Sequence, residues 1–141
     1  MHDMDELKSL LEKDGYTCVL SDGREIVTSR DRGVRPLVEL IKSGKDYSGY
    51  IAADRTIGKA AALLYAKLGV TRVYAFVMSA GGVEVCKRHG IAAEYAALTD
   101  KIINRKGDDI CPMEKTVMDI DAPDAAYEAI CKRLVELSAH D

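Results

Sequence analysis

The stretch TRVYAFVM at residues 71–78 is almost entirely apolar and rich in β-branched and aromatic side chains. A run of this kind is typical of a strand that is buried on both faces of a parallel sheet. Residues 55–68, rich in Ala and Leu and followed by Gly69, predict a helix before it, and residues 82–88 predict a second helix after it. This alternation predicts a three-layer α/β/α domain with a mixed central sheet.

The flanking segments extend the pattern in both directions. Apolar residues at helical spacing predict a first helix over residues 3–14 that ends at Gly15. The turn Ser21-Asp22-Gly23-Arg24 predicts a hairpin between two short strands. The further expected elements are a helix at 36–43, a strand at 48–53, a strand within 92–103 and a C-terminal helix at 122–138.

Length and composition narrow the class of protein. The 141 residues fit one domain over 1–141, and 48% hydrophobic with 30% charged residues indicates a soluble globular chain. A net charge of −3 argues against a nucleic-acid polymer as partner. We expect no membrane association, because no apolar run is long enough, and the acidic N-terminus makes the cytoplasm the expected compartment. The four cysteines form no CxxC pair and are expected to be reduced thiols.

Two segments are informative together: YIAADRT at residues 50–56 and MSAGGVE at residues 78–84. With these segments the chain resembles the cytidine deaminase-like fold. Zinc deaminases carry [His/Cys]-Ala-Glu at the start of one helix and Pro-Cys-x-x-Cys at the start of the next. The Ala-Asp-Arg-Thr of this chain matches Ala-Glu-Arg-Thr, which places Asp54 in the position of the glutamate. The resemblance implies that the two helix starts lie side by side at the carboxyl ends of parallel strands.

The zinc-ligand positions of the resemblance are Ala52, Gly81 and Glu84. A catalytic zinc in this class needs three ligands drawn from imidazole or thiolate, and none of these residues supplies one. The resemblance therefore implies the fold without a metal or another cofactor. It argues against hydrolytic deamination.

A second resemblance covers most of the chain. The segments GVRPL at residues 33–37, ADRTIGKAA at 53–61 and DDICPME at 108–114 are similar to the family called domain of unknown function 1893. That family is placed with the deaminase-like fold and has no assigned activity. It names relatives and supplies no function.

Asp54 is the first candidate site residue, with Arg55 and Thr56 directly after it. As the residue before the expected helix, Asp54 would cap the helix and complement its dipole. A carboxylate at that place could also hold an amino group of a ligand or act as a general acid or base. Both interpretations stay open.

A second candidate lies at the start of the next helix. Gly81 and Gly82, with the hydroxyl of Ser79, could bring free backbone N–H groups to an anion or a carbonyl oxygen. The alternative is a turn that simply needs glycine. Similarly, Arg32 and Arg35 could hold a phosphate or carboxylate, or they could belong to a solvated loop.

Cys111 precedes Pro112, which predicts a helical turn with the thiol at its N-cap. That position favours a thiolate, whereas the neighbouring Asp108, Asp109 and Glu114 oppose it by like-charge repulsion. Cys111 is therefore a candidate nucleophile, and Glu114 a candidate ligand contact.

Three functions remain open from the sequence. The favoured one is a zinc-free protein that binds a nucleotide-like or related small molecule in the remnant pocket. The second is an enzyme that uses Asp54 and Cys111 in chemistry without zinc. The third is a homo-oligomeric structural or regulatory module. Convergence of Asp54, Ser79 and Cys111 on one open pocket would favour the first two.

Overall fold

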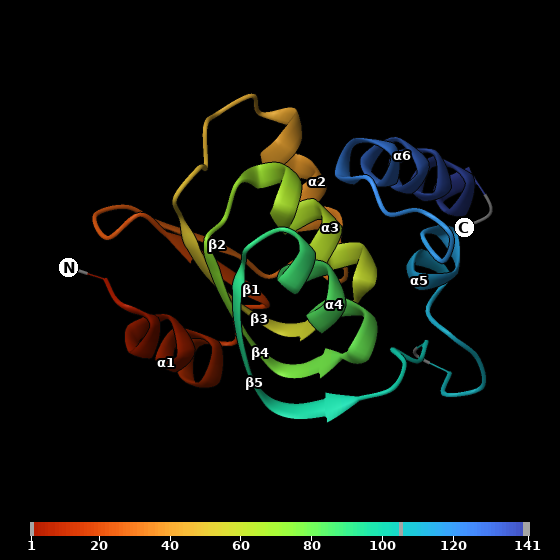
Figure 1. Cartoon of the computed structure of the whole chain (residues 1–141). Helices are drawn as coiled ribbons and strands as arrows, with labels where there is room; N and C mark the ends of the chain where they lie inside the picture. The colour runs from red at the N-terminus through yellow and green to blue at the C-terminus, as the bar shows by residue number, and fades with distance from the viewer. Residues whose placement is uncertain (1, 105, 140–141) are drawn as a thin grey trace.

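The structure is a computed structural model that describes residues 2–104 and 106–139. The elements along these residues are α1 (Met4–Asp14), β1 (Cys18–Ser21), β2 (Ile26–Ser29), α2 (Arg35–Lys42), β3 (Ile51–Ile57), α3 (Lys59–Leu68), β4 (Arg72–Ser79), α4 (Ala80–Arg88), β5 (Ala92–Thr99), α5 (Pro112–Thr116) and α6 (Pro123–Ala139). Figure 1 shows them in order along the chain. The predicted alternation of strands and helices is confirmed.

The strands form one mixed sheet in the order β2-β1-β3-β4-β5. Strand β1 is antiparallel to both β2 and β3, whereas β3, β4 and β5 are mutually parallel. The predicted hairpin is confirmed. At its turn the Asp22 carboxylate accepts bonds from the amides of Arg24 and Glu25 at 2.9 and 2.8 Å, and Gly23 takes a positive φ of 101°.

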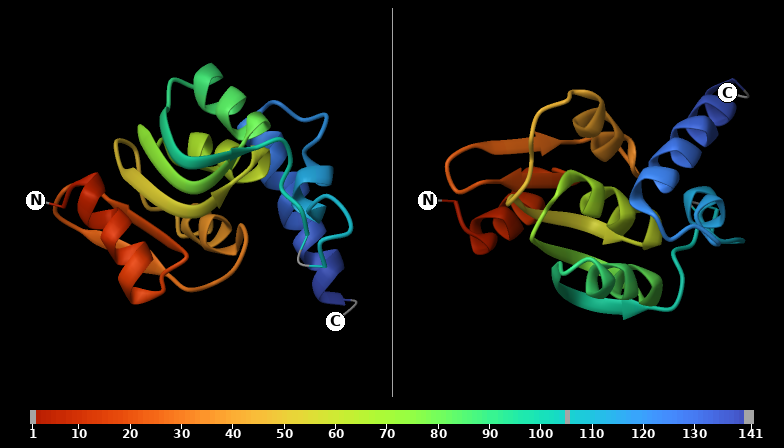
Figure 2. Two further views of the ribbon diagram at one scale, coloured as in Figure 1. Left: turned by 90° about the horizontal axis from the view of Figure 1, so that it is seen from below. Right: turned by 45° about the horizontal axis from the view of Figure 1, so that its top comes forward.

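Helices cover the sheet on both faces, which gives the predicted three layers. Helix α1 packs on one face, where Leu7 and Leu11 contact Val19 and Ala53. Helices α2, α3 and α4 cover the other face, and α6 packs against α3 on the outside (Figures 1 and 2). The larger core lies on this second face around α3. None of the helices described here combines the length and the apolar character needed to cross a bilayer.

The boundary between β3 and α3 differs from the expectation. A strand over 48–53 and a helix over 55–68 were expected, with Asp54 as the cap; β3 instead runs to Ile57 and the helix begins at Lys59. The N-cap of α3 is Gly58. The reason is pairing: β3 is hydrogen-bonded to β1 on one side and to β4 on the other, and the β4 pairing continues to Ile57. Asp54 as a helix cap is therefore wrong.

The starts of α3 and α4 lie side by side, as expected from the parallel strands before them. A Cβ atom on Gly82 would lie 2.8 Å from the carbonyl oxygen of Ile57 and 3.2 Å from that of Gly58. Only glycine fits so close to another backbone. The requirement for Gly82 is thus explained by the packing of two helix starts.

Candidate functional site

Asp54 lies in the middle of β3 and is only 9% exposed. The hydroxyl of Tyr65, from α3, donates a 2.7 Å hydrogen bond to its Oδ2 atom. The same hydroxyl lies 3.3 Å from the Sγ atom of Cys18, on the neighbouring strand β1. Strand register places Cys18 directly opposite Asp54. The three side chains form a buried Asp54–Tyr65–Cys18 chain, which links two strands and a helix.

Burial is the main cause of the raised pKa values of Asp54, Tyr65 and Cys18. It raises the pKa of Asp54 to about 6, although hydrogen bonds from Tyr65 and from the backbone of Thr56 act in the opposite direction. Burial and the neighbouring Asp54 carboxylate raise the pKa of the Cys18 thiol, and the same two causes raise the pKa of the Tyr65 phenol well above its ordinary value. Near neutral pH the carboxyl group is therefore the member of the chain that titrates.

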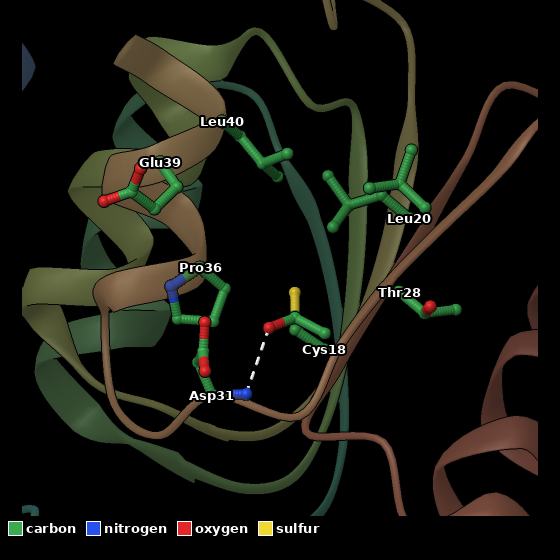
Figure 3. Close-up of a pocket in the computed structure, with 9 residues that line it drawn as sticks. Cys18, Leu20, Thr28, Asp31, Pro36, Glu39 and Leu40 are labelled. Atoms are coloured by element: carbon green, nitrogen blue, oxygen red, sulfur yellow. Dashed lines mark hydrogen bonds between the residues drawn. The ribbon is translucent and has the colours of Figure 1, made fainter. Parts of the chain in front are cut away.

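A pocket of about 150 Å³ opens beside this chain, between the β1–β2 hairpin and α2. In Figure 3 the sulfur of Cys18 points into it, with Leu20 on one side and Leu40 on the other. The lining residues are Cys18, Leu20, Val27, Thr28, Ser29, Asp31, Pro36, Glu39 and Leu40. The walls are mostly aliphatic, and polar groups come from the hairpin end and from α2. Cys18 is the residue that this pocket shares with the buried chain.

Glu114, a candidate ligand contact, is used within the protein at the start of α3. Its two carboxylate oxygens accept hydrogen bonds of 2.8 Å from the backbone amides of Lys59 and Ala60, at the start of α3. A carboxylate at a helix N-terminus satisfies unpaired amides and complements the helix dipole. The free end of α3 is thus closed by the protein's own side chain.

The start of α4 is also satisfied internally. The hydroxyl of Ser79 accepts a 3.0 Å hydrogen bond from the amide of Gly82 and caps the helix. A Cβ atom on Gly81 would meet that of Lys59 at an ordinary distance of 3.5 Å. Capping of α4 therefore explains why Ser79 is needed at its position, and the close packing of the two helix starts explains Gly82.

The arginine candidates lie in different places. Arg55 donates to the carbonyl oxygens of Tyr16 and Leu11 at 2.9 and 2.8 Å, on the face of the sheet that α1 covers. Arg35, exposed at the start of α2, approaches the hydroxyl of Ser138 at 3.4 Å. Arg32 is exposed in the loop before α2. The three side chains do not form one anion site.

Cys111 lies at the N-cap of α5, as predicted, and is half-buried. Its amide donates to the carbonyl oxygen of Ile102 at 2.9 Å. One helical turn further, Glu114 reaches the start of α3. Asp54 lies three residues before the end of β3, roughly 10 Å back along the strand. The described contacts therefore do not bring Cys111 to Asp54, and Thr56 is exposed beyond it.

Comparisons with known proteins place this arrangement in a family. Residues 6–134 match the model of TM1506, a domain of unknown function (DUF1893). The chain belongs to this family. It is also similar to the crystal structure of a DUF1893 family protein (TM1506) from Thermotoga maritima, with 27% identity and a TM-score of 0.83 over 94% of this chain and 92% of that one. A search of curated proteins found no match.

In this member of the DUF1893 family, sequence reasoning missed Tyr65 and Cys18. The sequence offers one signal for Tyr65, a phenol among the aliphatic residues of a predicted helix, since a buried tyrosine hydroxyl usually finds a partner. Nothing in the sequence pairs it with Asp54, eleven residues earlier. The position of Cys18 opposite Asp54 results from the pairing of β1 with β3, and this pairing is known only once the sheet is assembled.

The positions that the resemblance assigns to zinc ligands lie in β3 and α4. Ala52 is a buried residue of β3, and Glu84 pairs with Arg88 at 3.2 Å on α4. Within residues 2–104 and 106–139, no three His, Cys, Asp or Glu side chains are grouped so that they could hold a metal ion. The absence of zinc stays a prediction of the sequence, and its test is elemental analysis.

Proposed function

We propose that this protein binds a small polar ring, about the size of a nucleobase, in the pocket between the β1–β2 hairpin and α2. One observation carries the proposal: Cys18 lines the pocket and contacts Tyr65, which donates to the buried carboxyl group of Asp54. Burying a carboxyl group is unfavourable, and strongly perturbed carboxyl groups concentrate at functional sites. Asp54 does not itself line the pocket; Tyr65 and Cys18 connect it to the pocket wall.

The size of the pocket limits the ligand. An apolar cavity of about 150 Å³ holds a molecule of roughly benzene size. The aliphatic side chains of Leu20, Val27 and Leu40 can pack on the faces of a ring. A phosphate attached to that ring would lie outside, toward the loop where Arg32 follows Asp31. This is how a nucleotide-like ligand would be accommodated.

The polar groups favour a ligand that donates hydrogen bonds. Asp31 and Glu39 contribute to the lining, and carboxylates accept from amino groups. An ionised Asp54 accepts the hydrogen bond of the Tyr65 hydroxyl, so that the phenol oxygen can in turn accept from the Cys18 thiol. The lone pairs of the sulfur then face the pocket. Ring amino groups would find acceptors on more than one side.

A ligand screen by thermal shift tests the proposal. Adenine, cytosine, their nucleosides and their monophosphates are added to wild type, to Leu40→Phe, which fills the pocket, and to Leu134→Phe on α6 as a matched control. A ligand at one hundred times its Kd stabilises by about 2.7 kcal/mol, which raises the Tm by several degrees.

We expect such a rise in wild type and in Leu134→Phe, and its loss in Leu40→Phe. A compound that stabilises all three proteins equally binds elsewhere and contradicts the proposal. If no amino-bearing ring stabilises wild type, the pocket is not a binding site and the structural or regulatory alternative becomes the better one.

We further propose that the chain has the cytidine deaminase-like fold without its zinc. The sheet order β2-β1-β3-β4-β5 and the adjacent starts of α3 and α4 support this. Those starts carry glycines and a glutamate cap in place of thiolate or imidazole. Elemental analysis of freshly purified protein is expected to find far less than stoichiometric zinc.

A further inference from the structure

Strand β5 forms the outer edge of the sheet on the side of the parallel strands. It is eight residues long, Ala92–Thr99, and reads AAEYAALT. In Figure 1 it is the outermost strand, below α4. Its apolar side chains are open to solvent: Tyr95 is 41% and Leu98 is 56% exposed, and Ala92, Ala96 and Ala97 are also exposed.

The backbone groups of β5 alternate between the sheet and the free edge. The amide of Ala92 donates to the carbonyl oxygen of Thr71, at the start of β4. The register with β4 is constant along the strand, so even-numbered residues face β4. The amides and carbonyls of Ala93, Tyr95, Ala97 and Thr99 therefore point to the free edge. Within the described part of the chain, no strand pairs with them.

Exposed edges of this kind are normally protected by shortness, by lysine or proline, or by a bulge. The opposite edge strand, β2, has four residues and is protected by its shortness. Strand β5 has twice that length, no Lys or Pro and a constant register. Its single charged side chain, Glu94, pairs with Lys8 and Arg72 of the same chain. The edge is thus open to another strand.

We infer that β5 pairs with the β5 of a second copy of this chain, antiparallel across a two-fold axis at Ala96. Centring the axis there sets Tyr95 opposite Ala97 and Ala93 opposite Thr99 of the other copy. All four outward residues then form hydrogen-bonded pairs, with up to about eight hydrogen bonds in total. A two-fold contact of this type closes on itself and leaves no further edge on that side.

The side chains are compatible with this register. Small alanines lie at the axis, so the two backbones can approach closely. Glu94 lies opposite Leu98, so no like charges face each other. Asp100 of one copy lies opposite Ala92 of the other, and Arg72 is the neighbour of Ala92 on β4. Opposite charges are therefore brought near each other at both ends of the pairing.

Disulfide trapping tests the register directly. In an antiparallel pair, residues at a non-hydrogen-bonded position have Cα atoms about 4.5 Å apart, within the range of a disulfide. Ala96→Cys should therefore form a covalent dimer under mild oxidation, and peptide mapping should find the introduced thiol joined to the same position of the second copy. Ala92→Cys is the matched control, because its two copies would lie about 26 Å apart.

A proline variant tests the edge without trapping. Ala97→Pro removes an outward amide and leaves the bonds to β4 in place. Analytical ultracentrifugation should show a concentration-dependent dimer for wild type and for Val135→Lys, an exposed apolar position on α6. Ala97→Pro should weaken dimerisation by about tenfold or more.

A wild type that is monomeric at ~0.1 mM overturns the inference. A dimer that Ala97→Pro leaves unchanged, or equal trapping of Ala92→Cys and Ala96→Cys, also overturns it, because the contact then lies elsewhere. If Ala97→Pro does not fold, as judged by circular dichroism, the trapping experiment alone decides.

Discussion

Glu114 holds the first turn of α3 through both of its carboxylate oxygens, one on the amide of Lys59 and the other on that of Ala60, each at 2.8 Å. The cap and the start of α3 lie more than fifty residues apart in the sequence, so this contact joins α5 to α3 at the carboxyl end of the central strand β3. Gly58 makes room for it, because a Cβ atom there would lie 2.0 Å from Oε1 of Glu114. The cap and the glycine form one structural unit.

Removing this cap should destabilise the protein. Glu114→Ala leaves two amides of α3 without their partner, and we expect a loss of about 1–2 kcal/mol in the free energy of unfolding. Glu114→Gln should lose less, since its amide oxygen can still accept one bond. Urea unfolding measures both, with the exposed Glu12→Ala on α1 as control. Equal stability of Glu114→Ala and the control would show that the cap contributes nothing.

The two glycines at the start of α4 should respond in opposite ways to alanine. Gly82→Ala drives a Cβ atom against backbone carbonyls that cannot move aside, so we expect a loss of about 1–3 kcal/mol. Gly81→Ala meets only ordinary contacts and should gain up to about 1 kcal/mol, because alanine is the better helix former. Urea unfolding of the two variants makes the comparison. Similar effects from both would contradict the close packing of the helix starts.

The free energy of unfolding of wild type should depend on pH through the carboxyl group of Asp54. Its pKa is raised to about 6 in the folded protein, from 3.8, so the native state holds this proton more tightly than the unfolded state. The contribution of Asp54 is therefore fully present below about pH 4 and is lost as the pH rises through about 6. The loss is at most about 3 kcal/mol.

The measurement is the difference in unfolding free energy between wild type and Asp54→Asn, taken from pH 4 to pH 7.5. We expect wild type to lose stability relative to the variant over this interval. Asp119→Asn, at an exposed position, is measured beside it as the control. A flat difference for Asp54→Asn would mean that its carboxyl group is not desolvated.

The four thiols should differ in their rate of alkylation. Burial raises the pKa of Cys86 to about 11 and raises that of Cys18 further, so both should react slowly. Cys111 and Cys131 are half-buried and should react first. Both pack against the main core. We expect Cys111 to lead, because it lies at the end of a loop, at the N-cap of α5, whereas Cys131 lies within α6. Iodoacetamide labelling with peptide mapping at neutral pH gives the order, and faster labelling of Cys131 would contradict it.

Local signals predicted most of the elements. The hairpin at Gly23, the apolar β4 and the proline-led α6 follow from turn chemistry, burial pattern and helix periodicity. The β3–α3 boundary could not be predicted this way, because Ala-Asp-Arg-Thr has the composition of a capped helix start. Pairing with β1 and β4 decides against it. The hydrogen-bond partners of Asp54 and Glu114 could not be predicted for the same reason, because both contacts depend on the assembled fold.

Helix α1, which packs on the face of the sheet opposite α3, limits how far the protein can be truncated at its N-terminal end. Arg55 holds the C-terminal end of α1 by donating to the carbonyl oxygens of Leu11 and Tyr16. A fusion or truncation that deletes the helix would remove this cover. It would expose the apolar row around Val19, Ala53 and Phe76, which is the kind of surface that drives inclusion-body formation.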